Sequence, residues 1–379
     1  MKIAFFTDSY WPQINGVTIS IDNFAKELEK KGHKIMIFAP KTKEKPETKF
    51  DVFWIPSISL PTYKEYRISS LFSIEAEKKL KEFNPDIIHC HTPFSVGWIG
   101  LNLAKKFNKK SIGTYHTYLP DFLMYLPLPL IKKSELAKKG VWFYTKLFYN
   151  KCDLITTPTK QSAEELEKNS IKNIKVLPNG IDFKLFNSVQ CDKGLKKKKL
   201  VYFGRLSFEK NIEVLIEVLS LLENAELTII GSGPAEKTLK EKAKEKNLEK
   251  KVVFTGALKG KNLAGKVAES NLFITAATME TQGLTIAEAM ATGMPAVGAD
   301  KMAIPETIKE GINGFLFEPF NAGEAAEKIN KIFSDKKLYE KLSVNALKTA
   351  EKNSRKTRSE ELEKLYFKLL KKFNQNLGE

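Results

Sequence analysis

The chain has 379 residues, and its 62 lysine and arginine residues outnumber its 45 aspartate and glutamate residues, which gives a formal net charge of +17 at pH 7. A typical domain has about 150 residues, so this length excludes a single ordinary core and we expect two domains. The charge indicates a polyanionic partner and leaves nucleic acid, anionic lipid headgroups and phosphorylated small molecules open.

The cysteines and the apolar runs indicate the setting of the chain. Three cysteines without Cys-x-x-Cys spacing support neither a disulfide framework nor a thiolate metal site, and they favour a reducing, cytoplasmic compartment. No stretch approaches the roughly 18 consecutive apolar residues of a membrane-spanning helix. We therefore expect any membrane contact to be peripheral, on the inner face of the cell membrane.

In the first half of the chain, short apolar runs alternate with amphipathic helical patterns such as 17–31 and 73–83. This alternation predicts an α/β fold with a parallel, doubly wound sheet. The expected strands are 2–8, 34–40, 52–56, 86–91, 111–116 and 153–158.

The alternation of strand and helix patterns is interrupted by the polar stretch 189–199 and then resumes, so we place the linker between the domains near 185–198. From residue 322 onward the pattern is helical and ends in a basic amphipathic segment, 354–373, which is expected to pack on the first domain. The predicted domains are 1–188 with 355–379, and 189–354. The expected strands of the second sheet are 200–206, 226–231, 252–256, 272–277 and 295–298.

The most specific motif follows the last-but-one of these strands and opens a helical pattern: Glu280 and Glu288 flank Gly283. Gly283 allows close approach of the backbone to a ligand, and a helix start offers unpaired N–H groups and a positive dipole end to phosphate. Carboxylates accept hydrogen bonds from paired hydroxyls, which suits a sugar at one glutamate and a ribose at the other. Taken singly, each is also compatible with a solvated acid.

Two cations follow the strand that opens the second domain, in Gly204-Arg205-Leu-Ser-Phe-Glu-Lys210. Arg205 and Lys210 at the carboxyl end of a strand can neutralise the charge that grows on a departing diphosphate. The alternative is that both are ordinary surface charges.

Two strand ends of the first domain carry further candidates. Gly16 and Val17 lie in a turn-rich loop and open the next helix, which favours an anion or forms only a turn. His116 lies at the end of the predicted strand 111–116, where a lone histidine is more often structural than functional. His89 and His91 alternate along an apolar strand, which favours core positions over a metal pair.

Together these motifs resemble the retaining GT-B glycosyltransferases of family four, over nearly the whole chain, and Leu177-Pro-Asn-Gly-Ile-Asp182 adds to the resemblance. It implies two Rossmann-like domains facing across a cleft, with the nucleotide-sugar in the second. It also implies that Glu280 contacts the donor sugar, Glu288 the ribose, and His116 the region beside the transferred sugar. The donor phosphates would be met by Gly16, Val17, Gly204, Arg205, Lys210, Gly283, Leu284 and Thr285, with Glu280, His116, Arg205 and Lys210 as the catalytic set.

No Asp-x-Asp sequence occurs in the chain, so we expect no metal and no cofactor other than the nucleotide-sugar substrate. Helix dipoles and cations can replace a metal at a diphosphate.

Residues 105–151 contain ten lysines and two acids, interleaved with apolar and aromatic side chains. This mixture suits an anionic membrane surface, although the aromatic residues are equally compatible with a core. The candidates for acceptor and membrane contact are Tyr118, Phe122, Tyr125, Lys132, Lys133, Lys138 and Lys139.

Within family four, the segments 7–10, 114–118 and 280–285 look most like the diacylglycerol glucosyltransferases. That likeness implies transfer of glucose from UDP-glucose to 1,2-diacylglycerol with retention, giving an α-glycolipid. The alternatives are a phosphatidylinositol mannosyltransferase or another member of family four, a GT-B-shaped epimerase or phosphorylase, and a basic nucleic-acid-binding protein. We expect no nucleic acid as partner, because an RNP-like motif and a helix-turn-helix pattern are missing.

Overall fold

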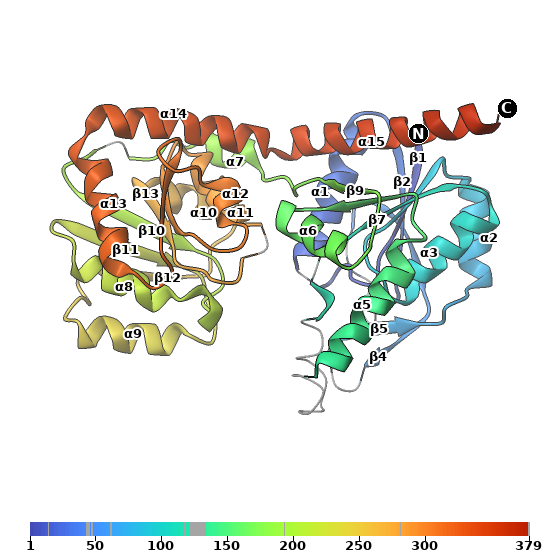
Figure 1. Cartoon of the computed structure of the whole chain (residues 1–379), viewed down its shortest axis with the longest axis horizontal. Helices are drawn as coiled ribbons and strands as arrows, with labels where there is room; N and C mark the ends of the chain where they lie inside the picture. The colour runs from blue at the N-terminus through green and yellow to red at the C-terminus, as the bar shows by residue number, and fades with distance from the viewer. Residues whose placement is uncertain are drawn as a thin grey trace. The chain divides into compact units, whose positions relative to one another are not determined.

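The structure is a computed structural model that describes residues 1–13, 15–42, 46, 48–60, 63–116, 118–120, 134–192, 194–280 and 282–377. It divides into two compact units, Met1–Pro178 with Arg358–Glu379, and Asn179–Thr357 (Figure 1). Each unit is an α/β structure around its own parallel sheet.

The first unit has a seven-stranded sheet in the order β3-β2-β1-β6-β7-β8-β9, and all neighbouring pairs are parallel. The order reverses between β1 and β6, and this reversal is the switch point at which ligands of doubly wound sheets bind. The strands are β1 (Lys2–Phe6), β2 (Lys34–Pro40), β3 (Asp51–Ile55), β6 (Ile87–Cys90), β7 (Lys110–Thr114), β8 (Leu154–Thr157) and β9 (Ile174–Val176).

Both faces of this sheet are covered, as expected for a parallel sheet with apolar strands. On one face, Ile3 and Phe5 pack against α1 (Gly16–Lys30) and against Leu362 and Tyr366 of α15 (Arg355–Leu377). The other face carries α2 (Ile74–Phe83), α3 (Ser95–Lys106), α5 (Glu135–Tyr149) and α6 (Lys160–Lys168). The C-terminal helix therefore packs on the first sheet, as its amphipathic pattern predicted.

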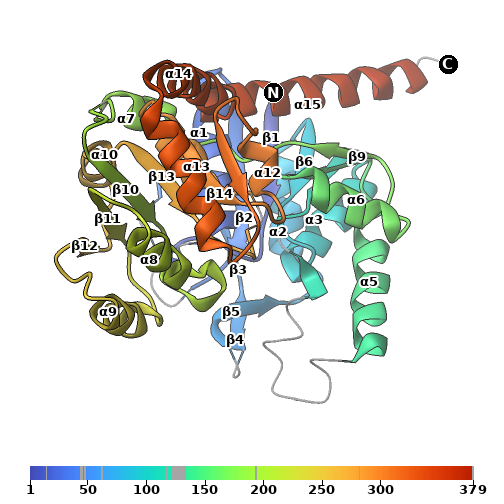
Figure 2. The same cartoon turned by 60° about the vertical axis from the view of Figure 1, so that its left-hand side comes forward.

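A two-stranded antiparallel hairpin, β4 (Ser57–Leu60) and β5 (Tyr63–Ser69), extends the first unit. Figures 1 and 2 show that this hairpin and the amino-terminal end of α5 project to the same side of the unit. The sequence patterns did not predict the hairpin.

The second unit has a six-stranded parallel sheet in the order β12-β11-β10-β13-β14-β15. Its strands are β10 (Lys198–Phe203), β11 (Ala225–Ile230), β12 (Val252–Gly256), β13 (Leu272–Thr275), β14 (Ala296–Ala299) and β15 (Gly314–Phe317). Its helices are α7 (Phe183–Asn187), α8 (Ile212–Ser220), α9 (Glu236–Glu245), α10 (Gly260–Ala268), α11 (Leu284–Met290), α12 (Ile304–Thr307), α13 (Ala322–Ser334) and α14 (Lys336–Lys352), with the short 3-10 helix η2 (Phe208–Lys210).

The first crossing of the chain between the units falls before α7, whereas the sequence pattern placed it after residue 188. Residues 179–188 go with the second unit because α7 packs on α10 and α11. The Ile181 N–H also donates to the Asn353 carbonyl at 2.9 Å, and the Arg355 N–H donates to the Ile181 carbonyl at 2.9 Å. These contacts tie the segment to the end of α14.

None of the helices within the described ranges is both long and apolar enough to cross a bilayer. Cys90, Cys152 and Cys191 are all buried, and none of the three forms a disulfide bond.

Candidate active site

Lys210 and Glu280, which the sequence placed in one site, form an ion pair in the second unit. The Lys210 ammonium donates to Glu280 Oε2 at 2.9 Å and to the Met279 carbonyl at 3.1 Å. The other carboxylate oxygen of Glu280 accepts the Gly283 N–H at 3.0 Å. Both side chains are about a fifth exposed, at 19% and 22%. A fixed cation therefore lies beside a carboxylate at the start of a helix, where a ligand can reach both.

The start of α11 differs from the expectation in one respect. Gly283 is in the left-handed conformation, with φ of 70°, which a glycine adopts without strain. Its N–H was predicted to meet a diphosphate, but it is bonded to Glu280. The N–H groups of Leu284 and Thr285 have no partner among the described residues and remain available to an anion.

Asn211, to which the sequence analysis gave no role, fixes the loop that carries Lys210. Asn211 is itself left-handed, with φ of 48°, and is buried. Its side-chain amide donates to the Ala276 carbonyl at 3.1 Å and to Thr278 Oγ1 at 2.9 Å. The loop between β10 and α8 is thus joined to the loop that follows β13. An asparagine directly after the second cation was the signal that could have revealed it.

Gln282 is a second residue that the sequence analysis missed. Its side chain accepts the Asn179 N–H at 3.0 Å and donates to the Asn179 carbonyl at 2.8 Å. The loop between Glu280 and Gly283 is therefore held to the first residue of the second unit. Gln282 and Asn179 are 103 residues apart in the sequence, so no local pattern indicated that they would meet.

Glu288 lies on α11, one turn beyond Thr285, and is partly buried. Burial raises the pKa of Glu288 to about 7; the nearby Arg355 opposes the rise and Asp182 adds to it. A carboxyl group with this pKa changes its charge near neutral pH, as groups at functional sites often do.

Gly204 and Arg205 lie at the carboxyl end of β10. The Gly204 N–H donates to the Ile230 carbonyl at 3.0 Å, and a Cβ on the facing Gly231 would lie 1.9 Å from the Gly204 oxygen. The glycines thus allow the loops after β10 and β11 to touch. The Arg205 side chain is exposed.

In the first unit, Asn15 takes up part of the helix start that was predicted to bind an anion. Asn15 Oδ1 accepts the N–H groups of Val17 and Thr18, each at 3.0 Å. The Val17 N–H is therefore already bonded within the protein. A Cβ on Gly16 would meet no atom within 4 Å, so Gly16 borders open space.

Asp8 at the end of β1 is buried and holds the start of α3. It accepts from Thr92 Oγ1 at 2.7 Å, Ser95 Oγ at 2.8 Å and the Val96 N–H at 2.8 Å. Burial raises the pKa of Asp8, and these hydrogen bonds oppose the rise. This aspartate joins β1 to α3 across the switch point.

His116 follows β7 and is the third ring of a histidine stack. The ring centroids of His89 and His91 are 4.1 Å apart, and those of His91 and His116 are 5.4 Å apart, with interplanar angles of 25° and 18°. His89 and His91 are buried, which confirms the predicted core positions, whereas His116 is partly exposed. Burial lowers the pKa of His116 to about 4, so all three rings are neutral near pH 7.

The predicted membrane segment is only partly described. Phe122, Tyr125, Lys132 and Lys133 lie outside the described residues. Tyr118 packs edge-on against Trp142, with ring centroids 5.8 Å apart. On α5, Lys138 is paired with Glu135 at 2.7 Å, whereas the Lys139 side chain is exposed.

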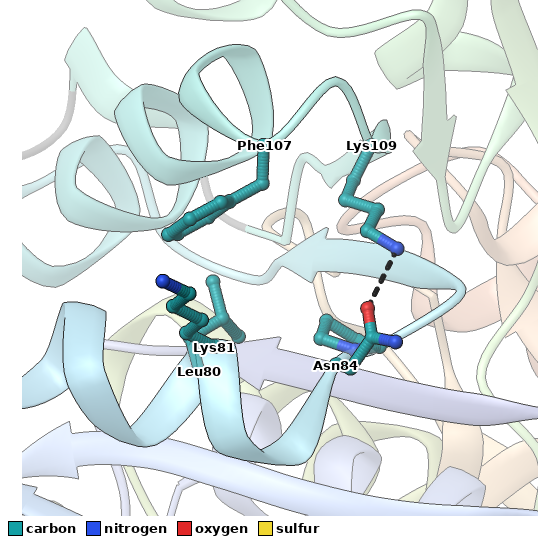
Figure 3. Close-up of a pocket in the computed structure, with 6 residues that line it drawn as sticks. Leu80, Lys81, Asn84, Phe107 and Lys109 are labelled. Carbon is teal, nitrogen blue, oxygen red and sulfur yellow. Dashed lines mark hydrogen bonds between the residues drawn. The ribbon is translucent and has the colours of Figure 1, made fainter.

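A hollow of about 230 Å³ in the first unit lies away from these residues (Figure 3). Lys109 donates to Asn84 Oδ1 across it at 3.0 Å. Because α2 and α3 end here, just before β6 and β7, the hollow lies at the amino ends of the strands, opposite to the edge that bears His91 and His116. Its lining is Leu80, Lys81, Asn84, Pro85, Phe107 and Lys109.

Within the described part of the chain, no three histidine, cysteine or acidic side chains come together as a metal-ligand set. The charged residues that the sequence analysis assigned to donor binding, Arg205, Lys210, Glu280 and Glu288, all lie in the second unit.

Two Rossmann-like units, each built on a parallel sheet, are the architecture of the GT-B fold. Solved structures share this fold. The chain aligns with sucrose-phosphate synthase from Thermosynechococcus elongatus at a TM-score of 0.75 and 19% identity, covering 97% of this chain and 98% of that one. It aligns with Anabaena HepE in complex with UDP-glucose at a TM-score of 0.71 and 18% identity, covering 96% and 99%.

Residues 14–185 match the family model described as Glycosyltransferase Family 4, and residues 185–349 match Glycosyl transferases group 1. The alpha-monoglucosyldiacylglycerol synthase of Streptococcus pneumoniae is 30% identical over 84% of this chain and 75% of its own. The GDP-mannose-dependent alpha-mannosyltransferase of Corynebacterium glutamicum is 31% identical over 84% and 77%. The synthase of Acholeplasma laidlawii with the same name as the first is 28% identical over the full length of both chains. The chain belongs to glycosyltransferase family 4 and is a hexosyltransferase, which confirms the resemblance found in its motifs.

Proposed function

We propose that this enzyme transfers glucose from UDP-glucose to 1,2-diacylglycerol, with retention of the α configuration, at an anionic membrane surface. Two relatives that match most of the chain are named alpha-monoglucosyldiacylglycerol synthases, and one of them matches it from end to end. Their name supports both the glucosyl group and the lipid acceptor.

The observation that carries the donor half of the proposal is the Lys210–Glu280 pair beside the start of α11. Lys210 neutralises charge on the leaving diphosphate, together with the exposed Arg205 and the N–H groups of Leu284 and Thr285. Glu280 accepts hydrogen bonds from the donor sugar, and Glu288 accepts them from the ribose hydroxyls. Gly16, Gly204 and His116 contribute the remaining contacts that the family resemblance implies.

Retention follows if the acceptor hydroxyl attacks the sugar from the face that the diphosphate leaves. The bond between the anomeric carbon and the phosphate oxygen breaks, and the bond to the acceptor oxygen forms. The acceptor proton passes to the departing phosphate oxygen, so the reaction requires no protein base. The cations perform the charge stabilisation, and the proposal includes no metal.

The membrane half of the proposal rests on α5. Leu136, Phe143 and Leu147 are 80%, 70% and 46% exposed and share one helix face, because they are seven and four residues apart. The exposed lysines Lys139 and Lys146 lie on the same helix. An apolar stripe flanked by lysines suits peripheral contact with anionic lipid on the inner face of the cell membrane.

The test is a transfer assay with purified protein and mixed vesicles that contain diacylglycerol or phosphatidylinositol, supplied with radiolabelled UDP-glucose, UDP-galactose or GDP-mannose. We expect labelled glycolipid only from UDP-glucose with diacylglycerol, with an α anomeric proton in its NMR spectrum and with undiminished yield in EDTA. A β product, or release of UDP that does not depend on the acceptor lipid, contradicts the proposal.

A second candidate is transfer of mannose from GDP-mannose to phosphatidylinositol or another lipid. It is supported by the 31% identical relative, which is named a GDP-mannose-dependent alpha-mannosyltransferase. The same assay separates the two, because the donor and the acceptor are varied independently.

A further inference from the structure

We propose that His91 is a positioning residue that fixes the tautomer of His116, so that His116 offers its Nδ1–H to an oxygen of the bound substrates. The role of His116 rests on the proposed function, whereas the hydrogen bond between the two rings is a property of the first unit alone.

The position of His91 is determined from several sides. Its N–H donates to the Phe6 carbonyl at 2.8 Å, which continues the pairing of β1 and β6. Its ring lies between those of His89 and His116, and Phe5 meets it edge-on at 4.8 Å. His91 is 1% exposed, so its ring has little room to turn.

His89 cannot compete for the hydrogen bonds of His91, because both of its own nitrogens are bonded elsewhere. Nδ1 of His89 lies 2.6 Å from the Tyr366 hydroxyl, and Nε2 lies 2.6 Å from Thr114 Oγ1. Thr114 Oγ1 in turn lies 2.6 Å from Thr156 Oγ1. The only histidine that His91 bonds is therefore His116, at 3.1 Å between His91 Nδ1 and His116 Nε2.

The environment of the other ring nitrogen of His91, Nε2, shows which of the two histidines donates the proton in this hydrogen bond. Nε2 of His91 is buried and has no hydrogen-bond partner among the described residues. A neutral imidazole carries one N–H, and a buried N–H without a partner is rarer and costlier than a buried acceptor without one. The proton of His91 therefore lies on Nδ1, where His116 Nε2 accepts it.

The tautomer of His116 follows directly. Because its Nε2 is the acceptor, its own proton lies on Nδ1, and the hydrogen bond to His91 is the one that joins the His116 ring to another described residue. His116 is partly exposed at the carboxyl end of β7, so this N–H can reach a ligand. A neutral ring that presents an N–H binds a hydroxyl or phosphate oxygen as a hydrogen-bond donor and does not act as a base.

The experiment uses the full chain labelled with ¹⁵N-histidine, in which only four histidines contribute signals. Long-range ¹H–¹⁵N correlation spectra without substrate show which nitrogen of each ring is protonated, and single substitutions assign the signals. We expect the proton of His116 on Nδ1 in the unaltered protein and in His91→Asn, whose amide can still donate. In His91→Phe we expect the signature of His116 to shift toward the Nε2–H form or a mixture of both.

Activity supplies the second measurement. His91→Phe should lower kcat about tenfold or more with a smaller change in KM, because a histidine in the wrong tautomer loses most of its contribution to the rate. His91→Asn should recover most of that loss. The control is His33→Gln, which removes another buried histidine of the same unit that is bonded to Glu363 and should leave the His116 signals unchanged.

The outcomes separate this inference from the proposed function. An Nε2–H tautomer of His116 in the unaltered protein, or signals unchanged in His91→Phe, overturns the inference even if glucose transfer is observed. An Nδ1–H tautomer that depends on His91, in a protein that transfers no sugar to any lipid tested, supports the inference and rejects the proposed function.

Discussion

Replacing Lys210 by alanine is the most direct perturbation of the proposed donor site. It removes a cation whose ammonium lies 2.9 Å from Glu280 Oε2, and it leaves that oxygen without its partner while Gly283 still binds the other. A hydrogen bond between charged groups contributes about 1.5–3 kcal/mol, and partial exposure places this pair near the lower end. We expect the free energy of unfolding to fall by about 1.5 kcal/mol, which leaves the enzyme folded.

The effect on catalysis should be larger than the effect on stability. A positive charge about 4 Å from a developing negative charge contributes about 4 kcal/mol at an effective dielectric constant of about 20. Removal of a preorganised group that stabilises developing charge commonly costs about 100-fold to 1000-fold in kcat. We expect a fall of kcat in that range for Lys210→Ala, with KM for UDP-glucose changed much less.

The assay is steady-state transfer to diacylglycerol in mixed vesicles, with thermal unfolding measured on the same samples. Lys240→Ala is the matched control, because Lys240 forms an ion pair with Glu236 at 2.7 Å on the surface of α9. It should keep its rate and nearly its full stability. If Lys210→Ala retains more than about a third of the rate of Lys240→Ala, the assignment of Lys210 to the diphosphate is refuted.

Three further predictions concern charge, membrane contact and the fold. Because the pKa of Glu288 is raised to about 7, the carboxylate that accepts hydrogen bonds from the ribose forms as pH rises. The Kd for UDP-glucose, measured by calorimetry, should therefore fall between pH 6 and 8. This pH dependence should vanish in Glu288→Gln. In the absence of ligand, the same raised pKa means that protonation of Glu288 favours the folded protein at low pH, and this contribution to the free energy of unfolding is lost as pH rises through about 7. The double variant Lys139→Gln with Lys146→Gln should bind anionic vesicles about 30-fold more weakly in sedimentation, at about 1 kcal/mol for each lysine removed. Equal binding of the unaltered protein to neutral and anionic vesicles would contradict lysine-driven docking. In urea titrations, Gly231→Ala should lower the free energy of unfolding by at least about 3 kcal/mol, because its Cβ would lie 1.9 Å from the Gly204 carbonyl oxygen. The control Gly265→Ala, whose Cβ would have no atom within 4 Å, should leave the free energy of unfolding unchanged or raise it.

The sequence determined those strands of both sheets that carry apolar runs. A strand that is buried on both faces consists almost wholly of apolar residues, and such a run can be recognised without knowledge of the tertiary structure. It also placed Glu280 and Glu288 on one strand-loop-helix element, which the structure has as β13, the loop after it and α11. It missed β9, β15 and the hairpin of β4 and β5. β9 and β15 are edge strands, and two of the three residues of β9 are exposed, so β9 lacks the apolar run of a buried strand.

Only the tertiary structure decided which distant residues meet. The bond between His91 and His116 depends on the register of β6 and β7, and the one between His89 and Tyr366 depends on the place at which α15 lands, 277 residues later. The bonds of Asn15 and of Glu280 likewise removed the Val17 and Gly283 N–H groups from the predicted anion contacts. Local periodicity encodes elements, whereas these pairings follow from packing two elements together, which no short stretch of sequence specifies.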